Sequence, residues 1–75
     1  MPDYPCLSSR DVEKMLRQHG FWFKKQEGSH MTFIGFIKGQ KRRVILVAGK
    51  KDIPAGTLSS IIRQSRLKKE EFYGY

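Results

Sequence analysis

Three runs of aromatic and β-branched residues, crowded into residues 21–48, constrain this chain more than any other feature. The runs cover residues 21–27, 30–37 and 42–48. Only a Gly-Ser pair and a four-residue polar segment separate them. Such runs are typical of β-strands, and strands joined by so few residues must pair antiparallel. The middle of the chain therefore predicts a three-stranded antiparallel sheet.

A helix is expected on each side of these strands. Apolar residues recur at helical spacing before them, which predicts a helix from about Ser9 to His19. Ser8, with Asp11 three residues later, resembles a capping box, and Gly20 suits the left-handed residue that ends the helix. After the strands, a second helix is expected to begin between residues 54 and 57, with a last short helical turn at 68–73. The buried positions expected on the two longer helices are Val12, Met15, Leu16, Leu58, Ile61 and Ile62.

This order predicts an α+β fold of the type αβββα. A chain of 75 residues forms one domain, with residues 1–7 as an irregular lead-in. Two helices can cover only one face of a three-stranded sheet, so the other face stays open. Both faces carry apolar residues, and the pattern alone does not choose the buried side. If Phe33 and Leu46 face the helices, His30 and Arg43 lie on the open face. An apolar patch suited to a partner would then accompany them, made of Ile34, Phe36, Ile45 and Val47.

The charge balance points to a polyanionic partner. Lys and Arg number 15 against 7 Asp and Glu, a net charge of +8. No apolar run approaches the length of a membrane span, which predicts a cytoplasmic protein without a membrane partner. The single cysteine, Cys6, permits no internal disulfide. The residues expected to contact RNA are Lys24, Lys25, Ser29, Lys41, Arg42, Arg43, Lys50 and Lys51. A solvated surface is the alternative role for the basic residues among them.

The residues that can carry chemistry are few. The acidic residues are scattered, and His19 and His30 lack metal-ligand spacing, so neither a metal nor a cofactor is expected. Metal-free RNA cleavage requires only a group that moves protons and a cation beside the phosphate. His30 follows a tight turn and has basic residues nearby in the sequence. It is the candidate catalytic residue, with an ordinary exposed strand residue as the alternative.

Several aromatic residues have two possible roles. Trp22, Phe36, Tyr73 and Tyr75 can stack on bases. Packing or a protein interface is the alternative for Trp22 and Phe36.

The segment Lys25-Gln26-Glu27-Gly28-Ser29-His30, followed later by Gly56-Thr57-Leu58, resembles the HicA family. Gly20-Phe21, Arg42-Arg43-Val44 and Glu70-Glu71-Phe72 extend the resemblance over residues 8–73. HicA proteins are small RNase toxins of bacterial and archaeal toxin–antitoxin pairs. The resemblance implies a fold like that of double-stranded-RNA-binding domains and an mRNA endonuclease activity. It also implies that His30 is catalytic and that an antitoxin of the HicB type neutralises the protein.

The chain departs from the family pattern beside His30. Many members have a second histidine where this chain has Met31, and another after the third strand, where this chain has Ala48-Gly49. Either a lysine, a water molecule or the chemistry of the partner strand then fills the role of the general acid, or this member is slow. Two other functions compete with the toxin RNase: a non-catalytic RNA-binding module of the same fold, and a domain that only docks another protein. A DNA-reading helix-turn-helix is disfavoured because three strands separate the two helices.

Overall fold

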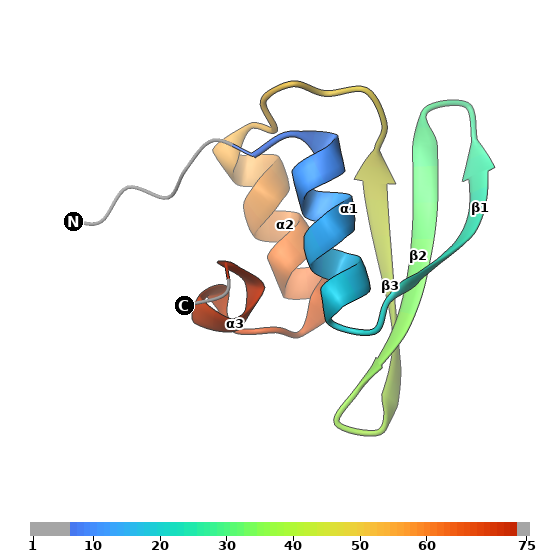
Figure 1. Ribbon diagram of the computed structural model, residues 1–75, viewed down its shortest axis with the longest axis vertical. Helices are drawn as coiled ribbons and strands as arrows, with labels where there is room; N and C mark the ends of the chain where they lie inside the picture. Colours follow the sequence, from blue (N-terminus) through green and yellow to red (C-terminus); the bar gives the residue numbers. More distant parts are fainter. Residues whose placement is uncertain (1–6, 74–75) are drawn as a thin grey trace.

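The computed structural model describes residues 7–73, with only the backbone of Tyr73, and it confirms the predicted α+β architecture (Figure 1). The elements are α1 (Ser9–Gln18), β1 (Trp22–Glu27), β2 (His30–Ile37), β3 (Gln40–Val47), α2 (Ala55–Ser65) and α3 (Lys69–Tyr73). The sheet is antiparallel with the order β1-β2-β3. Cys6, Tyr75, the side chain of Tyr73 and most of the predicted lead-in lie outside the described residues.

Two short turns set the register of the sheet. Gly28, at φ +60°, begins the turn between β1 and β2. Lys38 and Gly39 both have positive φ, at 53° and 77°, and form the turn between β2 and β3. A two-residue turn with both residues at positive φ matches the twist of the strands it joins. The predicted four-residue loop is therefore wrong, and β3 begins at Gln40 instead of Arg42.

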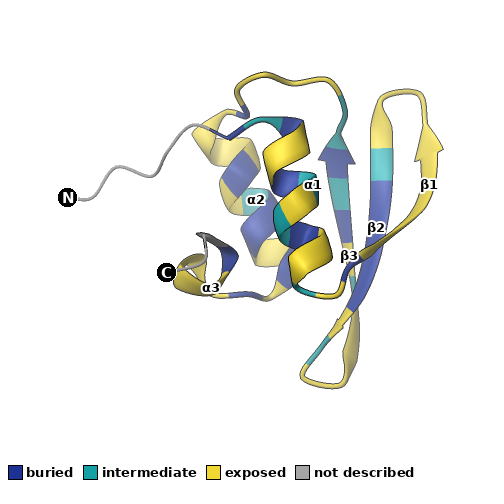
Figure 2. Cartoon of the chain, viewed as in Figure 1, coloured by how far each residue is buried: buried dark blue, intermediate teal, exposed yellow. Residues whose placement is uncertain are grey.

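The helices cover one face of the sheet and leave the other open, as predicted (Figure 1). Phe33, Val44 and Leu46 point toward the helices and are fully buried. Figure 2 shows this core between the helical layer and the middle of β2 and β3, whereas β1 is exposed along its whole length. Leu7, placed by the sequence in the lead-in, belongs to the core with 5% exposure, and its carbonyl accepts a hydrogen bond from Ile53 N–H.

Phe21 fixes the start of β1 on the buried side of the sheet. Its side chain is 2% exposed, and its N–H donates to the Leu16 carbonyl. A Cβ atom at Gly35 would lie 2.7 Å from two atoms of the Phe21 ring. Only glycine therefore allows this ring to rest against β2.

The N-terminus of α1 is tied to the end of β3. Ser8 and Asp11 form the predicted capping box. Ser9, which is 4% exposed, donates its hydroxyl to the Val47 carbonyl (2.6 Å) and accepts from Lys50 N–H (3.0 Å). Gly20, at φ +87°, takes the left-handed conformation expected after α1. The loop that follows β3 is thus anchored beside the first turn of α1.

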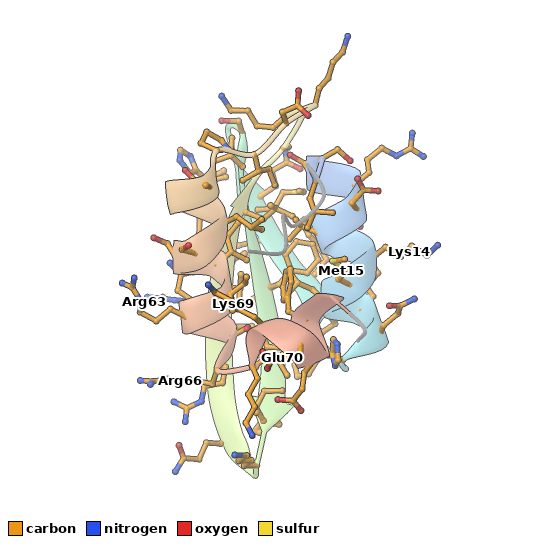
Figure 3. The ribbon with its side chains drawn as sticks, turned by 90° about the vertical axis from the view of Figure 1, so that its left-hand side faces the viewer. Lys14, Met15, Arg63, Arg66, Lys69 and Glu70 are labelled. Carbon is orange, nitrogen blue, oxygen red and sulfur yellow. The ribbon has the colours of Figure 1, made fainter. Side chains whose placement is uncertain are left out.

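The C-terminal helix α3 lies across the helical layer. Figure 3 looks onto that layer, with α1 and α2 side by side and α3 in front of their lower ends. Phe72 is 1% exposed and completes the core. His19 Nε2 lies 2.8 Å from the Glu71 carbonyl, a hydrogen bond between the end of α1 and α3. The predicted last turn of helix is therefore part of the packed structure.

The two edges of the sheet differ. At the outer edge of β3, the Gln64 side chain of α2 accepts a hydrogen bond from Ile45 N–H (3.0 Å). At the outer edge of β1, the register shifts between Phe23 and Lys25, so Lys24 forms a bulge. One edge is thus partly covered by a helix and the other is distorted.

Candidate active site

His30 is the first residue of β2 and is exposed, as predicted. Its cross-strand partners are Glu27 on β1 and Val47 on β3. The turn before it is held twice. Gln26 Nε2 donates to the Gly28 carbonyl (2.9 Å), and Ala48 N–H donates to the Ser29 carbonyl (2.7 Å). The backbone that carries His30 is therefore fixed by both neighbouring strands, while its side chain faces solvent.

The register arranges the open face in cross-strand rows. Starting from the His30 end, the rows are Glu27-His30-Val47, Lys25-Thr32-Ile45, Trp22-Ile34-Arg43 and Phe36-Lys41. His30 and Arg43 thus share the open face, as expected if Phe33 and Leu46 face the helices.

Lys25 and Glu27 are the charged side chains nearest to His30 in these rows. Glu27 is the direct partner of His30, and Lys25 lies one row away. Their side chains form an exposed ion pair, with 3.5 Å between Lys25 Nζ and Glu27 Oε1. An imidazole ring, a carboxylate and an ammonium group are therefore carried by neighbouring rows at one end of the sheet. Glu27 was not among the candidate site residues predicted from the sequence. A two-residue turn places the two residues that flank it opposite each other, so the Gly-Ser turn could have indicated Glu27 as the partner of His30.

The loop carrying Lys50 and Lys51 begins at the same end of the molecule. Ala48 bonds to the turn before His30, and Lys50 is held by Ser9. Both lysines are exposed. This part of the predicted RNA-contact set therefore lies on the same side of the fold as His30.

The remaining basic residues of that set lie elsewhere. At about 3.3 Å per residue along a strand, Arg43 is about 13 Å and Lys41 about 20 Å from the His30 row. Arg42 alternates to the helix-facing side, where its guanidinium bonds to the Gln40 side chain. Its Nε atom is buried and has no hydrogen-bond partner in the described part of the chain. Lys41 and Arg43 are thus separated from Lys50 and Lys51, because an extended strand places residues that are close in sequence far apart in space.

Residues 9–67 match the profile described as the HicA toxin of bacterial toxin–antitoxin pairs. The chain belongs to the HicA toxin family. No match was found among curated proteins. The matched segment runs from the start of α1 to just after α2, so it includes the sheet and His30 but not α3.

The apolar patch of this HicA toxin differs from the predicted one. Ile34 is only 3% exposed, so the expectation that it faces water is wrong. It sits on the central strand, with the large side chains of Trp22 and Arg43 on either side in its row. Phe36 is 58% exposed, whereas Ile45 and Val47 are half-buried. The exposed apolar surface of the open face is therefore concentrated on Phe36 and Trp22.

Within 7–73, no group of three or more His, Cys, Asp and Glu side chains is arranged to hold a metal ion. Within the same range, no helix is both long and apolar enough to cross a membrane.

Proposed function

We propose that this HicA toxin is an endoribonuclease that cleaves mRNA in the cytoplasm without a metal ion, with His30 as the group that moves a proton. The observation that carries the proposal is the placement of His30, exposed on the open face with Glu27 opposite and Lys25 in the next row. The net charge of +8 favours RNA as the partner. Membership of a toxin family supplies the biological setting.

The proposed reaction uses the nucleophile that RNA itself provides. The ribose 2′-oxygen attacks the adjacent phosphorus, the bond from phosphorus to the 5′-oxygen breaks, and the products end in a 2′,3′-cyclic phosphate and a 5′-hydroxyl. One group must take the 2′-OH proton and another must give a proton to the departing 5′-oxygen. His30 and Glu27 fill these two roles. Lys25 stabilises the extra negative charge that develops on the phosphate.

A cleavage assay tests this function. Purified protein is incubated with a long RNA in excess EDTA, and the 3′ ends of the products are analysed for cyclic phosphate. We expect cleavage by the natural chain and none by His30→Ala, with unchanged circular dichroism because His30 is exposed. Cleavage that persists in His30→Ala, or that stops on chelation, contradicts the mechanism. RNA binding without cleavage by the natural chain identifies a non-catalytic module instead.

We also propose that a HicB-type antitoxin neutralises the toxin by docking on the open face over His30. Phe36, Ile45 and Val47 supply apolar contact area on this face. The lysines and arginines around them attract an acidic partner and speed its encounter. A single docking event then excludes RNA from His30.

The docking proposal is tested by binding. The pair Phe36→Lys and Val47→Lys is expected to leave the fold intact and to abolish binding of the cognate antitoxin in calorimetry. Lys14→Glu, on the outer side of α1, is the control and should bind normally (Figure 3). A folded double variant that binds as tightly as the natural chain places the interface elsewhere.

A further inference from the structure

The end of the open face farthest from His30 carries two exposed aromatic side chains in contact with each other. Trp22 is 46% exposed and Phe36 is 58% exposed. Their ring centroids lie 6.1 Å apart with an interplanar angle of 25°, which is an offset stack. Both side chains point away from the helices, so neither contributes to the core.

The backbone beneath this ring pair is rigid. Phe21 precedes Trp22 and is locked against Gly35, which precedes Phe36. The same contact therefore fixes both residues that carry the exposed rings. The rings cannot turn into the core, because Trp22 and Phe36 alternate onto the face of the sheet opposite Phe21 and Gly35. The two side chains are thus held in water by the packing of their neighbours.

Positive charge lies beside the rings. Arg43 shares a cross-strand row with Trp22, and Lys41 is the partner of Phe36. Cations interleaved with exposed aromatic rings are typical of surfaces that bind single-stranded nucleic acid, where bases stack on the rings and phosphates meet the cations. The antitoxin proposed above covers Phe36 as well, and the cations beside the rings are the feature that adds a strand of nucleic acid as an occupant.

We propose that Trp22 and Phe36 form a stacking platform for unpaired nucleobases, so that the toxin takes single-stranded RNA. The inference rests on the proposed function and names its substrate class. In a duplex each base is covered on both faces by its neighbours and cannot stack on a protein ring. A single strand running along β2 from His30 can reach the platform with bases that are free.

The distance along the sheet fixes which bases reach the platform. Trp22 lies in the row four residues from His30, and Phe36 is six residues away on β2. At about 3.3 Å per strand residue these spacings are about 13 Å and 20 Å. At about 3.4 Å per nucleotide of stacked strand, they correspond to about four and six nucleotides. The bases that stack are therefore about four to six nucleotides from the cleaved bond.

The tryptophan itself reports on the platform, because Trp22 is the only tryptophan in the sequence. The inactive His30→Ala chain is titrated, with fluorescence detection, with an unstructured twelve-nucleotide RNA, the same RNA annealed to its complement, and inorganic polyphosphate. We expect strong quenching by the single strand and little by the other two. Phe36→Leu should weaken single-strand binding about tenfold. The control Phe23→Leu changes an aromatic residue that is 41% exposed on the opposite face, and it should bind as before.

Further outcomes separate this inference from the proposed function. Equal quenching by duplex or polyphosphate, or no quenching by any RNA, overturns the platform. Quenching by an antitoxin alone also overturns it and assigns the rings to a protein partner. Quenching by single strands without cleavage by the natural chain refutes the nuclease and retains the platform. With active enzyme, removing the bases four to six nucleotides from the cleaved bond should raise KM about tenfold, and Phe36→Leu should remove that sensitivity.

Discussion

At the scale of single residues, the carboxylate of Glu27 lies directly across the hairpin from His30. Glu27 shares a row with His30, and its charge also contacts Lys25. Where Met31 stands in place of a second histidine, Glu27 offers another group that can give or take a proton. Lys25 Nζ lies 3.5 Å from this carboxylate.

Glu27→Gln tests this role. The amide has nearly the same shape but cannot carry a proton, so kcat should fall by roughly a hundredfold or more while KM changes little. Glu70→Gln removes the same charge from α3, in the helical layer, and should leave kcat unchanged (Figure 3). A Glu27→Gln enzyme that cleaves as fast as the natural one would show that the carboxylate merely repels phosphate.

Arg43 is expected to contact phosphate, and Arg63 is its matched control. Arg43 lies on the open face, whereas Arg63 projects from α2 in the helical layer (Figure 3). For single strands, log affinity falls with log salt by about 0.7 per phosphate neutralised. Arg43→Ala should therefore flatten the slope by about 0.7, and Arg63→Ala should leave it unchanged. Equal effects of both substitutions would indicate diffuse charge attraction instead of a defined contact.

At the scale of elements, the capping box of α1 makes stability depend on pH. The backbone N–H of Ser8, and then its hydroxyl, hold the pKa of Asp11 below its ordinary value of 3.8. The ionised carboxylate therefore stabilises the folded state above about pH 3.8, and this stabilisation is lost as the pH falls through the lower folded-state pKa. Asp11→Ala should lower Tm at pH 6, with a gap that narrows as the pH falls below 3.8. Ser8→Ala removes the hydroxyl cap and should cost about 1 kcal/mol at pH 6, and less at low pH where Asp11 is protonated.

Gly35 is the position in the sheet where one added methyl group matters most. Gly35→Ala places a carbon against the Phe21 ring, which should destabilise the fold by about 1–3 kcal/mol in urea unfolding. Adding Phe21→Leu should recover part of that loss, measured as a coupling energy. Gly56→Ala, where the new methyl group meets no atom within 4 Å in α2, should be neutral or stabilising. Independent, additive effects of Gly35→Ala and Phe21→Leu would disprove the contact.

The turns show what an element's sequence can and cannot reveal. The turn between β1 and β2 was predicted correctly from the Gly-Ser pair. Gly28 has positive φ there, a conformation that glycine adopts without steric cost. The turn between β2 and β3 was predicted too long. Lys38 has positive φ in this turn, and lysine is a residue type that rarely adopts that conformation. The same error shifted the start of β3 by two residues.

At the scale of the whole molecule, α3 contributes to the hydrophobic core although it lies outside the residues that match the family. The match ends at residue 67, yet Phe72 is almost fully buried. Phe72→Ala should cost about 3–5 kcal/mol. A domain of this size has roughly 4–11 kcal/mol in all. A chain ending at Leu67 should therefore be less stable, with a clearly lower Tm by circular dichroism. A cooperative unfolding transition with unchanged Tm in that shortened chain would show that α3 is dispensable.

The sequence predicted the architecture because helical spacing, strand runs and short links all agreed. It predicted correctly that His30 is exposed after the turn, whereas the catalytic role of His30 stays a prediction from the turn and the family resemblance. It could not separate Lys41 and Arg43 from Lys50, because that separation depends on the length of an extended strand. It also predicted that Ile34 is exposed, whereas this side chain is buried. The alternation of side chains along a strand gives the face on which a side chain lies, but not how far neighbouring side chains cover it.

The unequal edges of the sheet bear on what happens when the toxin is released from its antitoxin. An exposed strand edge invites a second copy to add its own strand, the first step of aggregation. Here the Gln64 side chain accepts a hydrogen bond from Ile45 N–H at the β3 edge. The bulge at Lys24 interrupts the regular backbone of the β1 edge. Two neighbouring lysines on β1 also repel the same strand of another molecule. A freed toxin at high local concentration should therefore remain dispersed and ready to meet RNA.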